Sequence, residues 1–175
     1  MRRIVVAVVL GALGVTGCSR RASNDAHVSP WSTVGIGSVF VSRSVTRMEK
    51  PFAHVTETTT KQTLVARTGS EASVKIEISE GSATAAQDVK IPLREDLVQP
   101  HDGSTVTTSE ETCTVPAGTF QCTRTTVEMT RGDATSSSVT WTTKQIPVPL
   151  RSIVTNENMT VTTELTNVTG ALPRR

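Results

Sequence analysis

Large aromatic side chains are scarce in this sequence of 175 residues, which contains three phenylalanines, two tryptophans and no tyrosine. Aromatic side chains bury more apolar area than other residues in protein cores. Any core of this chain must therefore be built mainly from valine, isoleucine and leucine, and few large side chains remain to fill a concave surface.

Motifs for catalysis and for binding a metal or cofactor are also missing. The sequence has no Gly-x-Ser-x-Gly nucleophile turn and no glycine-rich phosphate loop. Its histidines, His27, His54 and His101, are scattered without ligand spacing, whereas a zinc site takes four ligands. We therefore expect no enzymatic activity, no cofactor and no metal site.

No apolar run is long enough to span a bilayer. The stretch from Ile4 to Val15 follows a basic start and is shorter than the roughly 20 residues of a membrane helix, a layout typical of an export signal. The sequence "VTGC", which ends at Cys18, resembles the lipobox of bacterial lipoproteins, in which the cysteine is diacylated. The resemblance implies a signal peptide over residues 1–17 and a stable acyl anchor on Cys18 in the cell envelope. Ser19 favours the outer membrane under the enterobacterial sorting rule.

The expected mature chain has no excess of positive or negative side chains. The formal net charge of +2 comes from 18 basic and 16 acidic side chains and includes Arg2 and Arg3, so cleavage before Cys18 leaves equal numbers of each. A neutral chain lacks the basic surface of a nucleic-acid-binding protein. We therefore expect the protein to contact the membrane through its acyl anchor and to bind no nucleic acid.

The mature chain has the length of one domain. Residues 18–30 are polar and predict a flexible tether, and we expect a β domain over residues 31–175. About thirty threonines and many valines favour strands over helices in this domain.

Alternation of apolar and polar residues predicts where the strands lie. In "SVKIEIS", Val74, Ile76 and Ile78 share one face while Lys75 and Glu77 point to the other. Similar segments with turn signals between them predict roughly eight strands, mostly joined by hairpins, over residues 34–45, 54–68, 73–79, 104–115, 119–130, 135–144, 150–156 and 159–168. Residues 84–100 are ambiguous between a short helix and a strand. The expected fold is an all-β single curved antiparallel meander, a half-barrel or partly closed barrel.

Cys113 and Cys122 enclose a predicted hairpin turn in "CTVPAGTFQC". If residues 117–118 or residues 116–119 form the loop, the two cysteines lie directly opposite each other, which suits a disulfide. A three-residue Pro-Ala-Gly loop instead places them on opposite faces and forbids the bond. Because disulfides persist in exported proteins, we expect a Cys113–Cys122 disulfide that fixes the register of this hairpin.

The same turn carries a resemblance to a protein family. The segments "VPAGTFQC", "IPVPLRS" and "TELTNV" resemble those of a group of largely uncharacterised bacterial envelope proteins, although "VPLRS" replaces their usual "VGLVK". The matching residues of this sequence are Val115, Pro116, Ala117, Gly118, Thr119, Phe120, Cys122, Trp141, Pro147, Glu164 and Leu165. The resemblance implies a shape similar to the half-barrels of LolA/LolB-like lipoprotein carriers.

Two functions are compatible with such a fold. A single curved sheet with little helix must cover its apolar face in some way. In one hypothesis the concave face, including Phe120 and Trp141, holds an apolar ligand or a lipid. In the other, aliphatic side chains close the core and the protein is a structural or interaction module that docks an envelope partner. The sequence leaves both open.

Overall fold

The computed structural model describes residues 27–95, 104–131 and 134–170. The elements in these ranges, in chain order, are β1 (His27–Val28), the 3-10 helix η1 (Pro30–Ser32), β2 (Val39–Met48), β3 (His54–Arg67), β4 (Glu71–Glu80), β5 (Ala83–Pro92), β6 (Arg94–Glu95), β7 (Ser104–Val115), β8 (Gly118–Arg131), β9 (Ala134–Thr143), β10 (Ile146–Asn156) and β11 (Met159–Thr169). The predicted signal peptide, Cys18 and Ser19 lie outside the described residues.

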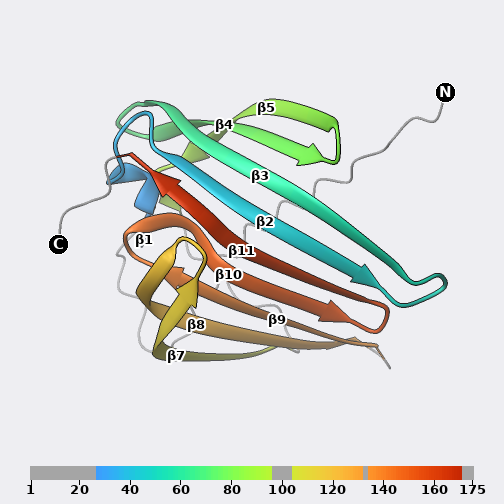
Figure 1. Ribbon diagram of the computed structural model, residues 1–175. Coiled ribbons are helices and arrows are strands. Elements are labelled where there is room, and N and C mark those ends of the chain that lie inside the picture. The colour runs from blue at the N-terminus through green and yellow to red at the C-terminus, as the bar shows by residue number, and fades with distance from the viewer. Residues whose placement is uncertain (1–26, 96–103, 132–133, 171–175) are drawn as a thin grey trace.

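Nine of these strands form one antiparallel sheet in the order β5-β4-β3-β2-β11-β10-β9-β8-β7, and β1 pairs separately with β6. Every neighbour in the large sheet except the β2/β11 pair is a sequence neighbour, so the topology consists of two meanders, β2 to β5 and β7 to β11, that are joined where the last strand pairs with β2. Within the described residues the sheet remains open, with β5 and β7 as its two edges. The expected all-β, curved antiparallel meander is confirmed (Figure 1).

Most strands lie where the alternation predicts them, and the first part of the ambiguous segment 84–100 belongs to the strand β5, which ends at Pro92. β10 differs, because it begins at Ile146 and therefore includes Pro147 and Pro149. Proline cannot donate a hydrogen bond to a neighbouring strand. The pairing of β10 with β9 is irregular between Ile146 and Arg151, and this stretch accommodates both prolines.

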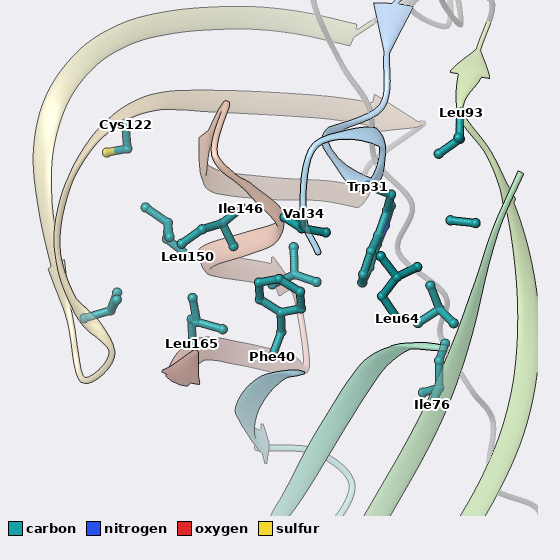
Figure 2. Close-up of a cluster of buried hydrophobic side chains, with 14 of the residues drawn as sticks. Trp31, Val34, Phe40, Leu64, Ile76, Leu93, Cys122, Ile146, Leu150 and Leu165 are labelled. Carbon is teal, nitrogen blue, oxygen red and sulfur yellow. The ribbon is translucent and has the colours of Figure 1, made fainter. Parts of the chain in front are cut away.

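The core is one cluster of buried hydrophobic residues that lies at the end of the sheet nearest η1. Trp31 of η1 stands in its middle, with Val34 and Phe40 on one side and Leu64 on the other (Figure 2). The other buried hydrophobic members are Ala72, Val74, Ile76, Leu93, Cys113, Val115, Cys122, Ile146, Val148, Leu150 and Leu165. The chain thus uses one of its two tryptophans to fill the apolar face of its own sheet.

Residues ahead of Trp31 also belong to this architecture. His27 and Val28 pair with Glu95 and Arg94 in β6, and the Ser29 amide donates to the Leu93 carbonyl at 3.0 Å. These residues lie at the end of the tether predicted over residues 18–30. Polar composition alone did not reveal that a two-residue strand would hold them against β6.

The segment after η1 is held by one arginine of β3. Arg67 Nη1 donates hydrogen bonds to the carbonyl oxygens of Ser32 at 2.6 Å and Val34 at 2.9 Å. These carbonyls lie at the end of η1 and in the loop that follows it, outside the strand ladders, and a charged donor satisfies them strongly. Arg67 therefore fixes the segment that carries Trp31 and Val34 over the core.

Candidate functional site

The turn motif from Val115 to Phe120 forms a tight hairpin. Val115 pairs with Gly118 in the β7/β8 ladder, so the loop is Pro116-Ala117. Gly118 has a φ of +140°, a conformation that favours glycine. The hydroxyls of Thr114 and Thr119 also meet across the hairpin at 3.0 Å.

This hairpin reaches back across the sheet. The Ala117 amide donates to the Leu165 carbonyl of β11 at 3.2 Å, although β9 and β10 lie between β11 and this hairpin in the sheet order. Figure 1 shows the β7–β8 hairpin, in yellow, curled toward β10 and β11. Val115 is buried in the core, and the turn motif therefore contributes to packing at this end of the sheet.

The prediction that Cys113 and Cys122 lie directly opposite each other is wrong, because the partner of each cysteine is displaced by two residues along the facing strand. Cys113 lies opposite Phe120, and Cys122 lies opposite Glu111. The loop does have two residues, but it is 116–117 rather than 117–118. Cys113 and Cys122 consequently share a face as diagonal neighbours, a longer separation than that of a directly opposed pair.

Both cysteines are buried free thiols in this structure. The Cys122 thiol donates to the Glu111 carbonyl oxygen at 3.3 Å. Burial raises the pKa of Cys122 to about 12, and its hydrogen bond with Cys113 acts in the same direction. The Cys113–Cys122 disulfide stays a prediction from the sequence.

Phe120 and Trp141 were predicted to share a ligand-binding face. They do point to the same face, because Phe120, Cys122 and Arg124 alternate along β8 and Arg124 lies opposite Trp141. Cys122 stands between them, however, and both aromatic rings are half-buried against the core cluster. The two rings therefore do not form a continuous exposed aromatic surface.

Trp141 instead lies at the centre of a charged cluster. Its indole Nε1 donates to Glu111 Oε1 at 2.6 Å. The guanidinium carbons of Arg124 and Arg151 lie 5.7 Å and 5.3 Å from the ring centroid, within cation–π range. Arg124 comes from β8 and Arg151 from β10, the two strands that flank Trp141 in β9.

The charged face continues across β11 and β2. Arg151 lies opposite Glu164, which lies opposite Arg43. Arg43 makes a bidentate ion pair with Glu57, with both N–O distances at 2.6 Å. No spacing in the sequence indicates this row, because its members come from separate strands and are aligned only by the register.

The opposite face of β2 carries the core residue Phe40 and then turns polar. Ser42 and Ser44 follow Phe40 at alternate positions, and the Ser44 and Thr163 hydroxyls lie 2.8 Å apart. Ser44 belongs to a row of hydroxyl residues across seven neighbouring strands, namely Thr58, Ser44, Thr163, Ser152, Thr140, Thr125 and Thr108.

A depression of about 360 Å³ lies near the β7–β8 hairpin. It is lined mainly by polar side chains, from Glu110, Phe120, Gln121, Thr123, Thr142, Thr143, Lys144 and Gln145. Binding sites for apolar ligands are lined predominantly by hydrophobic side chains, so this depression does not have the lining of a lipid site.

The described ranges contain no helix that is long and apolar enough to cross a membrane. In the same ranges, no three His, Cys, Asp or Glu side chains are grouped as metal ligands.

No protein-family model matches the chain, and no curated protein does. A crystal structure from Bacteroides fragilis, described as a candidate exported protein with a YmcC-like fold, is similar over 82% of this chain and 99% of its own, with 9% sequence identity and a TM-score of 0.47.

Proposed function

We propose that the protein is an exported, lipid-anchored protein of the cell envelope without catalytic activity, and that its β domain is an interaction module with a closed core. Export and the anchor on Cys18 rest on the N-terminal sequence, and the outer membrane rests on Ser19. The absence of catalytic motifs from the sequence supports a non-enzymatic role.

The filled core is the observation that favours a module over a carrier. Trp31 and Val34 cover the apolar end of the sheet and are 4% and 0% exposed. Next to the core on the same face of β2 come Ser42 and Ser44. An acyl chain needs a continuous apolar lining, and the hydroxyl row interrupts it. These features favour contact with an envelope partner through the outer surfaces.

An apolar-ligand carrier is the second candidate, and one feature favours it. Beyond the hydroxyl row, Val161 lies opposite Val154 and Val127 lies opposite Val106, on the face of the sheet that carries Phe40. Val154 is exposed, which leaves an apolar surface for a short hydrophobic group.

Intact and native mass spectrometry of the protein from membranes of the producing cell tests these functions together. We expect a chain that begins at Cys18 and carries acyl groups, with no further lipid-sized adduct. Cys18→Ala should remove the acyl mass and release the protein from the membrane, whereas Cys113→Ser should change neither. An unmodified Cys18 contradicts the anchor.

A lipid-sized adduct that survives gentle purification would favour the carrier over the closed module. Spectra recorded before and after reduction also report the predicted disulfide, through a gain of two hydrogens on reduction. An unchanged mass shows that Cys113 and Cys122 are thiols in the cell.

A further inference from the structure

We propose that Arg124, Trp141 and Arg151 form a binding site for a ligand with two oxyanion groups, carboxylate or phosphate, that lie roughly 10 Å apart. Three strands bring these residues into one row, since Trp141 lies opposite Arg124 of β8 on one side and Arg151 of β10 on the other. The two guanidinium carbons lie 5.7 Å and 5.3 Å from the indole centroid.

The two guanidinium groups are held in fixed positions. Each is attracted to the π system of the same indole, and the indole is itself held by the 2.6 Å hydrogen bond from Trp141 Nε1 to Glu111 Oε1. The Nε atoms of Arg124 and Arg151 are buried and have no hydrogen-bond partner among the described residues. Any ligand therefore meets the outer amino groups of two arginines whose orientation is already set.

Arg124 has no acidic ion-pair partner among the described residues, so its positive charge is not neutralised by a salt bridge. Across the described ranges Arg124 makes no ion pair, whereas Arg151 Nε lies 3.5 Å from Glu164 Oε1. Glu111, the other neighbouring carboxylate, accepts the hydrogen bond from Trp141. A half-buried charge without a partner is unfavourable, and an oxyanion bound to Arg124 would offset that cost.

The spacing of the strands sets the size of the ligand. Adjacent strands are about 4.8 Å apart, so β8 and β10, with β9 between them, place the two arginines roughly 10 Å apart. A planar guanidinium binds a carboxylate or phosphate through two parallel hydrogen bonds. A single small anion reaches one arginine, and a ligand with two groups at this spacing engages both. This site requires neither the acyl anchor nor the closed core.

The NMR signal of the Trp141 indole N–H reports binding directly. The chain has two tryptophans, and Trp31→Phe assigns the two indole signals. The full mature protein is titrated with linear α,ω-dicarboxylates and α,ω-bisphosphonates of increasing chain length, and with inorganic phosphate. We expect a saturable shift of the Trp141 signal, tightest for the chain length that spans both arginines. The two series distinguish carboxylate from phosphate as the preferred group.

Arg124→Gln should weaken binding about tenfold or more, as expected for loss of a charge-assisted hydrogen-bonded pair. Arg43→Gln is the matched control, because it removes the same charge from the same row but from an arginine already paired with Glu57, and binding should change less than about twofold. Arg124→Lys keeps the charge without the fork and should also weaken binding, which covers the case of an unfolded glutamine variant.

Three results would overturn the proposal. The first is an unmoved Trp141 signal at millimolar concentrations of every probe. The second is equal weakening by Arg43→Gln and Arg124→Gln, which would indicate unspecific charge attraction. The third is binding of inorganic phosphate as tight as that of the longer dianions.

Discussion

The indole ring of Trp31 meets the phenyl ring of Phe40 edge to face, with centroids 5.5 Å apart and ring planes at 89°. Trp31 belongs to the short helix ahead of the large sheet, and Phe40 lies in β2, which neighbours the central strand β11. This contact joins the N-terminal segment to the middle of the sheet, and edge-to-face packing is a favourable arrangement for aromatic pairs. It is part of the filled core that disfavours a lipid carrier.

Trp31→Ala should strongly destabilise the domain. Removing a buried aromatic side chain costs about 3–5 kcal/mol through lost burial and the cavity left behind, and Trp31 is 4% exposed. Urea unfolding followed by circular dichroism measures the loss. Phe52→Ala is the control, because Phe52 is 82% exposed and its removal should cost less than about 0.5 kcal/mol. Similar losses for the two variants would contradict the described core.

Gly170→Ala should destabilise the end of β11. Gly170 has a φ of +109°, and an added Cβ would lie 2.7 Å from the Cα of Ser38. Both the backbone conformation and the clash oppose a side chain, and we expect a loss of about 1–3 kcal/mol. Gly69→Ala is the matched control, since its Cβ would meet no atom within 4 Å. Thermal unfolding of both variants should show a lower midpoint for Gly170→Ala alone.

The strands could be predicted because each depends on local sequence. The predicted segment 104–115 coincides with β7, and 119–130 lies within β8, since alternation and turn residues are readable within a dozen positions. The sequence predicts a strand only from residue 150, whereas β10 begins at Ile146, because Pro147 is typical of a turn rather than of a strand with irregular pairing. The sequence also does not predict that Trp31 is part of the core, because no local pattern indicates that η1 packs on the sheet.

The candidate site could not be predicted because it depends on register. A shift of one residue in the loop changed the partner of Cys113 from Cys122 to Phe120. The alignment of Arg124, Trp141 and Arg151 requires the registers of two strand pairs at once. Cross-strand alignment of this kind is set by turn geometry and packing of the whole sheet.

Cys122 should react slowly with thiol reagents in the reduced, folded protein. Burial raises its pKa to about 12, and the thiolate is the reactive form. Alkylation by iodoacetamide at pH 8, followed by mass spectrometry, should modify Cys122 only after denaturation. The raised pKa stabilises the fold fully below the ordinary value of 9.0, and this contribution is lost as pH rises from there toward 12. Fast labelling of folded protein at pH 8 would show that the thiol is accessible.

Arg43→Gln should raise the pKa of Glu57. The side-chain hydrogen bond from Arg43 holds the pKa of this carboxyl below its ordinary value of 4.5. The pair therefore favours the folded state above that value, and the contribution is lost as pH falls through the lower, folded-state pKa. Carbon-detected NMR titration of the carboxyl measures the change.

Lys61→Gln is the matched control for this titration. Lys61 pairs with Glu77 at 2.9 Å, and its hydrogen bond is the largest cause of the lowered pKa of that carboxyl. The control variant should raise the pKa of Glu77 and leave Glu57 unchanged, and Arg43→Gln should do the reverse. Because both pairs lie at the surface of the sheet, where ion pairs contribute little to stability, the two variants should have similar and small effects on the free energy of unfolding. Equal responses of the two carboxyls to both variants would show that net charge, rather than these cross-strand pairs, sets their pKa values.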